Sequence, residues 1–257
     1  MSPKDLQPYP PSLRSIAIAE VVALASEPVS LNRIAITTGI PKPTVHRFIN
    51  TLVESRLLLR EAHRKAYSAG ERLSAMAIGI MSHSSLRNER RSILRSLVDQ
   101  IGETCNFTTV DVNDVVYVDR VEAAWPLRLH LQPGSHVPIH CTSSGKLFLA
   151  HMPARQRRRL LYGAAIKRYT PKTITDPARL EAELVRIRKT KISTDDEGYL
   201  AGLISVAVPV LGRNRRMIGA VAVHAPTARM SLKRALAHVS LLRRAASDLG
   251  RIYRQFK

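Results

Sequence analysis

Residues Pro41 to Ser55, PKPTVHRFINTLVES, predict an amphipathic helix with one apolar and one polar face. A proline is tolerated in the first turn of such a helix, where its missing N–H is not needed. The apolar stripe recurs at helical spacing; its members are Val45, Phe48, Ile49 and Leu52. The other face combines cationic, hydroxyl and amide groups, which can hydrogen-bond phosphates and base edges. Its members are Lys42, Thr44, His46, Arg47, Asn50 and Thr51. We interpret this stretch as a candidate recognition helix.

The segment before this helix predicts a shorter helix that ends in a turn. Ser30 to Thr38, SLNRIAITT, opens with a serine that can cap a helix and then repeats apolar residues at helical spacing. Gly39-Ile40-Pro41 marks the turn. Helix, turn and helix in this order form the helix-turn-helix arrangement of DNA-binding proteins. A plain helical hairpin with a solvated polar face has the same spacing, so these two helices alone leave both interpretations open.

Two short strands with a charged tip follow the candidate recognition helix. Leu57 to Arg60 and Ala66 to Gly70 flank the basic turn Glu61 to Lys65. Such a wing can lie along the DNA backbone beside the recognition helix. A leading helix over Ser12 to Ser26 has apolar residues at helical spacing and is expected to pack under the other two. The candidate DNA-contacting residues are Ser30, Lys42, Thr44, His46, Arg47, Asn50, Arg60, Arg64 and Lys65.

Taken in order, these motifs and three more downstream resemble the IclR family of bacterial transcription regulators. The matching segments are TGIPKPTVHRFINTL, a Y-x-x-G at Tyr67 to Gly70, HCTSSGKLFLA at His140 to Ala150, TPKTITDPARLEAELVRIR at Thr170 to Arg188, and TDDEGYLAGLISVAVPV at Thr194 to Val210. The resemblance implies an α+β fold in four parts. These are a disordered tail over residues 1–11, a winged helix-turn-helix domain over 12–70, a linker and dimerisation helix over 71–84, and a GAF-like effector-binding α/β sandwich over 85–257.

The linker segment Glu71 to Ser82, ERLSAMAIGIMS, predicts a helix with very little polar face. A short exposed helix this apolar is unfavourable in water, so we expect it to bury against a second copy of the chain. The family resemblance implies the same dimer contacts. A helix buried within its own domain is the alternative. The candidate dimerisation residues are Leu73, Met76, Ile78 and Ile80.

The rest of the chain predicts helices mixed with antiparallel strands, which make an α+β sandwich. The expected helices are Leu86 to Ile101 and a long closing helix from Ser231 to Phe256. The expected strands are Asn106 to Val112, Val115 to Val121, Leu127 to Leu131, Leu203 to Leu211 and Met217 to Ala225. Asn113-Asp114 is a turn signal between the first two strands.

A candidate anion site lies where Thr142-Ser143-Ser144-Gly145 precedes a predicted helix, Lys146 to Met152. The backbone N–H groups and positive dipole at a helix start can hold an anion. Simple capping by Ser143 or Ser144 would look the same in sequence. The resemblance implies that a small organic acid binds here, with Ser143, Ser144, Gly145, Asp195, Ser205 and His224 as effector-binding residues. Gly198 and His224 depart from the family pattern, and Asp195 with His224 as an ordinary buried pair is the alternative.

The sequence also contains residues typical of two other kinds of site. Ser143-Ser144-Gly145-Lys146 matches the S-x-x-K motif of serine acyl-transfer enzymes, but the companion S-D-N and K-T-G motifs are absent. A hydrolase-like enzyme using Ser143 with His224 or Lys146 is therefore an alternative that leaves the first 80 or so residues without a role. A metal site would draw on His130, His136, His140, Cys141 and His151, of which His136 and His140 are expected to share a strand face. Their spacing shows no two-plus-two ligand pattern, so we predict structural histidines, no metal and no cofactor.

The charge of the chain suggests a polyanionic partner. The formal net charge is +20, but the final 57 residues carry a surplus of ten positive charges against four in the first 70. Those residues are either solvated surface or a source of nonspecific attraction to DNA. A basic architectural DNA protein without an effector is a further alternative function. Only two cysteines are present, so a disulfide framework is not expected. The N-terminus has no apolar core of the kind found in signal peptides. The longest apolar run, Ala75 to Met81, is too short to cross a bilayer.

The sequence therefore predicts a transcriptional regulator, not an enzyme, that binds double-stranded DNA and responds to a ligand. Two-fold symmetry would give a palindromic operator bound by a homodimer, or by a homotetramer built as a dimer of dimers. The expected effector is a small organic acid, aromatic or keto. The expected location is the cytoplasm, at the nucleoid when bound to DNA, with no membrane partner.

Overall fold

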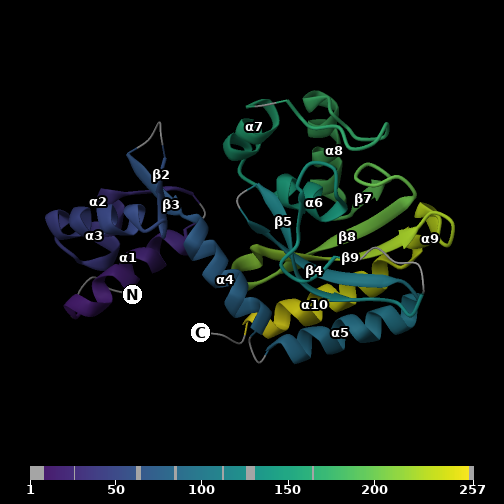
Figure 1. Ribbon diagram of the computed structural model, residues 1–257, viewed down its shortest axis with the longest axis horizontal. Coiled ribbons are helices and arrows are strands. Elements are labelled where there is room, and N and C mark those ends of the chain that lie inside the picture. Colours follow the sequence, from purple (N-terminus) through teal and green to yellow (C-terminus); the bar gives the residue numbers. More distant parts are fainter. Residues whose placement is uncertain are drawn as a thin grey trace. The chain divides into compact units, whose positions relative to one another are not determined.

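The computed structural model describes residues 9–25, 27–61, 65–83, 86–111, 113–125, 131–163 and 165–254. The chain forms two compact units, Met1–Ile80 and Met81–Lys257 (Figure 1). Some sequence predictions lie outside the described residues: Arg64, His130, the tip of the wing, residues 1–8 of the tail and nearly all of the strand expected over 127–131. No helix within the described ranges is both long enough and apolar enough to span a bilayer.

The first unit is a small helical domain with a three-stranded antiparallel sheet in the order β1-β3-β2. Its elements are η1 (Pro11–Leu13), α1 (Arg14–Ala23), β1 (Val29–Ser30), α2 (Leu31–Thr38), α3 (Lys42–Glu54), β2 (Leu58–Arg60), β3 (Ala66–Ala69) and the start of α4 (Glu71–His83). The helices α1, α2 and α3 and all three strands contribute to the buried core, which includes Ile18, Val22, Val29, Ile34, Val45, Ile49, Leu58 and Tyr67.

Local signals at the turn between α2 and α3 act as the sequence predicts. The hydroxyl of Ser30 caps α2 by accepting a hydrogen bond from the Arg33 N–H at 3.3 Å. Gly39 ends α2 with a positive φ of 71°, which an L side chain rarely adopts. Pro43 then occupies the first turn of α3. The two helices are thereby set at the spacing of a helix-turn-helix, and the predicted N-terminal domain of this type is confirmed.

The second unit is a six-stranded antiparallel sheet in the order β6-β5-β4-β9-β8-β7. Its strands are β4 (Thr104–Asp111), β5 (Asp114–Val121), β6 (His136–Pro138), β7 (Ser193–Asp196), β8 (Leu203–Leu211) and β9 (Met217–Pro226). Its helices are α5 (Leu86–Ile101), α6 (Ser143–His151), α7 (Ala154–Tyr162), α8 (Pro177–Thr190), α9 (Leu232–Ala237) and α10 (Val239–Arg254), with the short turn η2 (Arg213–Arg215) before β9. The α+β class is confirmed.

The two faces of this sheet belong to two separate cores. Helices α5 and α10 cover one face, and α6 and α8 cover the other (Figure 1). Alternate residues of each strand point to opposite faces. Phe107 and Val221 accordingly belong to the α5 and α10 core, whereas Ala207, Ala220 and Ala222 belong to the α6 and α8 core. This alternation decides which polar residues of the strands face α6.

The structure corrects several boundaries expected from the sequence. Helix α6 begins at Ser143, three residues earlier than expected, because Thr142 is its cap. The single closing helix is two helices, α9 and α10, with His238 between them. Neither glycine nor proline marks that break, so the pattern could not signal it. The strands β1 and β7 were not predicted, since two and four residues are too few to show a strand's alternation. The helix α7 was not predicted either.

Candidate functional site

The polar face of α3 is exposed along its length. Lys42, His46, Arg47 and Asn50 are exposed and Thr44 is half-buried. On the other side Val45, Ile49 and Leu52 are buried in the domain core. The helix is thus held by its apolar stripe while its hydrogen-bonding groups remain available. The guanidinium of Arg47 lies 5.5 Å from the ring centroid of Phe48, which orients it along the helix surface.

The wing next to α3 is a two-stranded antiparallel pair. Leu59 of β2 pairs with Ser68 of β3, and Arg60 pairs with Tyr67. Arg60 is exposed with its guanidinium 5.9 Å from the Tyr67 ring centroid, and Lys65 is exposed. Ser30, the remaining predicted DNA contact, is exposed but already caps α2. The wing therefore presents two described cations for a phosphate backbone.

The start of α4 packs against the first unit, and two of its later apolar side chains, Met76 and Ile80, are exposed. Gly70 is required here because a Cβ would lie 2.3 Å from the Arg56 carbonyl oxygen. Leu73, predicted as a dimer contact, packs against the core of its own domain. Ile78 is half-buried, whereas Met76 and Ile80 are 53% and 68% exposed. Within one chain, the apolar surface of α4 is therefore carried mainly by Met76 and Ile80.

The N-terminus of α6 is capped by Thr142, not by Ser143 or Ser144. The hydroxyl of Thr142 accepts from the Gly145 N–H at 3.2 Å and donates to the Pro138 carbonyl at 2.8 Å. The Lys146 N–H bonds the Thr142 carbonyl oxygen. The backbone N–H groups of Ser143 and Ser144 have no hydrogen-bond partner among the described residues. Both serines are buried, so two backbone donors at a positive helix end point into the protein interior.

Three predicted effector residues form one row across the sheet. In register, Asp195 of β7 pairs with Ser205 of β8, and Ser205 pairs with His224 of β9. Paired residues of an antiparallel sheet project from the same face. The hydroxyls of Ser205 and Ser143 lie 2.7 Å apart. The row therefore faces the start of α6, and the structure brings together all six predicted effector-binding residues.

The titratable groups of this row are strongly perturbed. Burial raises the pKa of Asp195 to about 6, against the opposing effects of Lys146 and of backbone N–H groups of Gly198 and Tyr199. Burial, and then the nearby Arg120 cation, lower the pKa of His224 to about 3. His224 is therefore neutral at physiological pH.

Asp195 and His224 do not form the buried pair considered from the sequence. Strand β8 lies between them, and the Asp195 carboxylate accepts from the Gly198 N–H at 2.7 Å. The Nε2 atom of His224 is buried with no hydrogen-bond partner among the described residues. The absence of that pair leaves both side chains as candidate ligand contacts.

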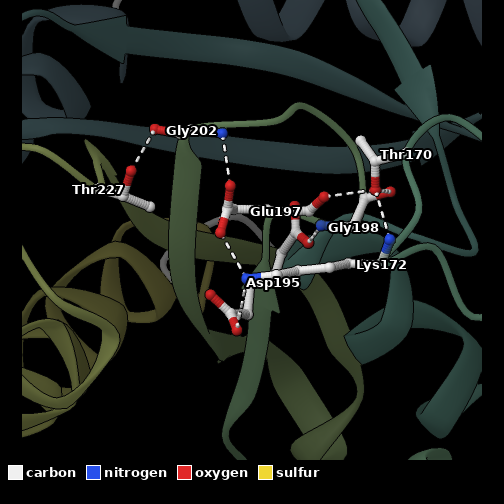
Figure 2. Close-up of polar contacts among 8 residues, drawn as sticks. Thr170, Lys172, Asp195, Glu197, Gly198, Gly202 and Thr227 are labelled. Atoms are coloured by element: carbon white, nitrogen blue, oxygen red, sulfur yellow. Dashed lines mark hydrogen bonds and ion pairs between the residues drawn. The ribbon is translucent and has the colours of Figure 1, made fainter.

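The segment before α8 holds the loop after β7 beside Asp195 through ion pairs and a hydrogen bond (Figure 2). Lys172 forms ion pairs with Asp196 and Glu197, and the Thr170 hydroxyl donates to the Glu197 carbonyl at 2.7 Å. A Cβ on Gly198 would lie 2.8 Å from Asp195 Oδ1. Gly198, which departs from the family pattern in the sequence, thus lets the backbone approach the Asp195 carboxylate closely enough to donate to it.

The geometry does not support the hydrolase alternative. The hydroxyl of Ser143 meets another hydroxyl, that of Ser205, whereas an activated serine needs a neighbouring base. Lys146 is buried with its Nζ 3.9 Å from Glu183 Oε1, and burial lowers its pKa. His224 Nε2 makes no bond to Ser143. Neither Lys146 Nζ nor His224 Nε2 therefore has a hydrogen bond to the Ser143 hydroxyl.

The histidines and cysteine considered for a metal are scattered. His136 lies on β6 and His140 in the turn after it, so the expected shared strand face is wrong; the strand ends at Pro138. His136 Nε2 lies 3.4 Å from Asp111 Oδ2, and His140 Nε2 lies 2.9 Å from the Lys167 carbonyl. In the described part of the chain, no three side chains of metal-binding type gather in one place.

Sequence reasoning missed two residues on the same sheet face, Asn106 and Arg120. Asn106 of β4 pairs with Arg120 of β5 and with Ala222 of β9. Both side chains are buried. The signal was present in the strand NFTTVDV, where an asparagine occupies a position that alternation turns inward.

Comparisons with known proteins give a consistent result. A family model described as "Bacterial transcriptional regulator IclR C-terminal" matches residues 78–251, and one described as "IclR helix-turn-helix domain" matches residues 13–62. The chain is 40% identical to the probable transcriptional regulator SauR of Cupriavidus necator, over 94% of this chain and 96% of that protein.

Two solved structures are similar along most of their length. A transcriptional regulator from Rhodococcus sp. RHA1 has a TM-score of 0.66 and 27% identity, covering 97% of this chain and 100% of that chain. The inducer-binding domain of the PobR transcription factor from Acinetobacter, a double mutant in complex with 3-hydroxybenzoic acid, has a TM-score of 0.59 and 28% identity. It covers 65% of this chain and 98% of that chain.

Proposed function

The chain belongs to the IclR family of bacterial DNA-binding transcriptional regulators, and we propose that it is a member whose affinity for a palindromic operator is controlled by a small organic acid. The protein then acts as a homodimer, or as a dimer of dimers, in the cytoplasm. Control by an organic acid is supported above all by the 2.7 Å contact between the hydroxyls of Ser143 and Ser205. This contact places the start of α6, which has two N–H groups without a partner among the described residues, beside the row of Asp195, Ser205 and His224.

DNA recognition is assigned to the exposed polar face of α3 and to the wing. Arg47 and Asn50 are the residues we expect to read base edges, because a guanidinium and a carboxamide form bidentate bonds with guanine and adenine. Arg60 and Lys65 on the wing are expected to contact phosphates. The surplus positive charge of the last 57 residues adds long-range attraction to DNA that salt would screen.

A dimer is supported by the apolar residues exposed on helices of the first unit. Met76 and Ile80 lie one helical turn apart on α4, and Ile16 of α1 is 61% exposed. A second copy would bury these side chains and remove their contact with water. Two recognition helices related by two-fold symmetry would then read the two halves of a palindrome.

The effector is assigned to the start of α6. Its carboxylate would accept hydrogen bonds from the N–H groups of Ser143 and Ser144, and the rest of the molecule would lie toward Asp195, Ser205 and His224. The PobR domain, at 28% identity, holds 3-hydroxybenzoic acid, which agrees with a carboxylate ligand. An effector can change DNA affinity only if it binds two arrangements of the protein unequally. Helix α4 runs unbroken across the boundary between the two units and is the element we expect to transmit that difference.

The test begins with the operator, which can be isolated from a pool of random duplexes by repeated binding to the purified full-length protein. Gel shifts and sedimentation should show a dimer or tetramer bound to a palindromic site more tightly than to random duplex of the same length. A thermal-shift screen of small carboxylates should then find an acid that changes that affinity. Equal binding to all duplexes would point to the architectural alternative.

A further inference from the structure

We infer that Asn106 recognises a second, oxygen-bearing polar group on the effector, so that the ligand is a bifunctional acid with one carboxylate at the start of α6 and an acceptor oxygen at its other end. The inference rests on the proposed effector site and extends it. His224 and Arg120 flank Asn106 on the same face of the sheet and are the neighbouring groups available to the same end of the ligand.

The position of Asn106 follows from the strand register. On β4, Cys105 and Phe107 belong to the core under α5 and α10. Asn106 lies between them in sequence and therefore projects to the opposite face, toward α6. Its partner across β9 is Ala222, and His224 lies two residues further along that strand. Asn106 thus shares a face with the row of Asp195, Ser205 and His224.

The amide of Asn106 lacks the partners that a buried amide normally has. The residue is 0% exposed, and neither Oδ1 nor Nδ2 has a hydrogen-bond partner among the described residues. The paired residue Ala222 and its neighbours Ala207 and Ala220 have methyl side chains that offer no hydrogen bond. Leaving a buried polar group without a partner is costly, and proteins rarely do so without a reason. His224 Nε2, on the next strand, is in the same condition.

The hydrogen-bond donors of Asn106, His224 and Arg120 favour a ligand that carries an acceptor oxygen at this end. The Nδ2 group of Asn106 donates hydrogen bonds, neutral His224 can donate from a ring nitrogen, and Arg120 is a cation that only donates. Arg120 already lies 3.5 Å from Glu122 Oε1, so its charge is partly balanced. A hydroxyl or carbonyl oxygen, or a second acid group, would satisfy these donors. An apolar end would leave the Asn106 amide and His224 Nε2 without a hydrogen-bond partner among the described residues.

The two ends of the site are separated by a short span. The carboxylate end lies beside Ser205 on β8 and the other end beside Asn106 on β4, with β9 between them. Two interstrand spacings make about 10 Å between the strands. A benzene ring or a four-carbon chain joining two polar groups fits such a span, hydrogen bonds included.

Two matched ligand series test the inference on the full-length protein by titration calorimetry. One series is benzoate, 4-hydroxybenzoate and terephthalate; the other is butyrate, 4-hydroxybutyrate and succinate. The parent should bind one of the bifunctional acids about tenfold more tightly than its monoacid, the value of one well-made hydrogen bond or slightly more. Asn106→Leu should reduce this ratio to near one while leaving monoacid binding nearly unchanged.

Further variants identify the distal group and control for folding. Asn106→Asp should reject a second acid group but still accept a hydroxyl, which separates those two ligand chemistries. Thr108→Val is the control, because Thr108 is buried on the same strand and face but already bonds the Ala220 carbonyl; it should leave the ratio intact. Without ligand, Asn106→Leu should melt at the same or a higher temperature than the parent, because it removes an unpartnered buried amide.

The outcomes separate this inference from the proposed function. If Asn106→Leu keeps the parent's ratio, or the parent binds monoacids as tightly as bifunctional acids, Asn106 does not recognise the ligand, although the acid site itself stands. A lower melting temperature for Asn106→Leu with an unchanged ratio would show a structural role and overturn the inference. If the parent binds none of the six acids, the acid effector site is rejected together with it.

Discussion

The hydroxyl oxygen of Ser143, in the first turn of α6, lies 2.7 Å from the hydroxyl oxygen of Ser205, on strand β8 of the sheet. The two residues are 62 positions apart in the chain. Their contact holds the helix start against strand β8, so the first turn of α6, which carries the N–H groups of Ser143 and Ser144, lies beside the row that includes Asp195 and His224. The arrangement leads to predictions for ligand binding, for pH dependence and for DNA binding.

Ser144→Pro should abolish the response to the effector. The substitution removes one of the two unpartnered N–H groups, and proline is tolerated in the first helical turn. The matched control is Ser144→Ala, which keeps the N–H group and should respond to the effector like the parent. Operator binding by the ligand-free protein should stay within about twofold of the parent in both variants, far below the effect of one lost base contact. An unchanged ligand response of Ser144→Pro in gel shifts would show that the start of α6 is only a capped helix.

Asp195→Asn should change how stability depends on pH. Burial raises the pKa of Asp195 from 3.8 to about 6, so the folded protein holds this proton more tightly than the unfolded chain does. Ionisation of Asp195 therefore costs stability, and the cost grows as the pH rises from about 4 to about 6. An asparagine side chain does not ionise, so the variant does not lose this stability as the pH rises. Relative to the parent, its free energy of unfolding should increase by about 2 kcal/mol between pH 4 and pH 7.

Urea unfolding of both proteins at the two pH values measures this difference. Asparagine keeps an oxygen that can accept from the Gly198 N–H, so the loop after β7 should stay in place. A stability difference between variant and parent that is the same at both pH values would mean that Asp195 does not titrate in this range.

Arg47→Ala should weaken operator binding by about 1–3 kcal/mol if Arg47 reads a guanine. Because Arg47 is exposed, the free energy of unfolding should change by less than about 0.5 kcal/mol. Its affinity for random duplex should fall much less than its affinity for the operator, and fluorescence anisotropy with both duplexes measures the two losses. Equal losses on the two duplexes would assign Arg47 to the phosphate backbone.

Met76→Glu combined with Ile80→Glu should give monomers with greatly reduced operator affinity. Both side chains are exposed on one line of α4, and burying two carboxylates in an apolar interface is unfavourable. Loss of the dimer also removes the gain from binding two half-sites together. Ala75→Glu adds a charge to an exposed position on a different side of the helix and serves as the control. A double variant that still sediments as a dimer would place the pairing surface elsewhere.

Much of the DNA-binding unit could be predicted from the sequence because its signals are local. The stripe of Val45, Ile49 and Leu52, the Ser30 cap and the Gly39 turn each depend on residues within four positions of one another, the range over which helix geometry acts. The same holds for the strands β8 and β9 and for helix α5, whose limits match the expected ones within one residue. Family motifs added the order of the elements.

The tertiary structure alone decided which distant residues meet. Thr142 caps α6 in place of the neighbouring serines, because its hydroxyl is held by the Pro138 carbonyl and faces the Gly145 N–H. Leu73 turned out to pack against its own domain. Alternation in the sequence turns Asn106 inward, but only the structure shows that its amide has no hydrogen-bond partner among the described residues. Thr142 and Leu73 depend on how their helices pack against neighbouring elements. Asn106 depends on strand register, because a one-residue shift of β4 would turn its side chain to the other face of the sheet.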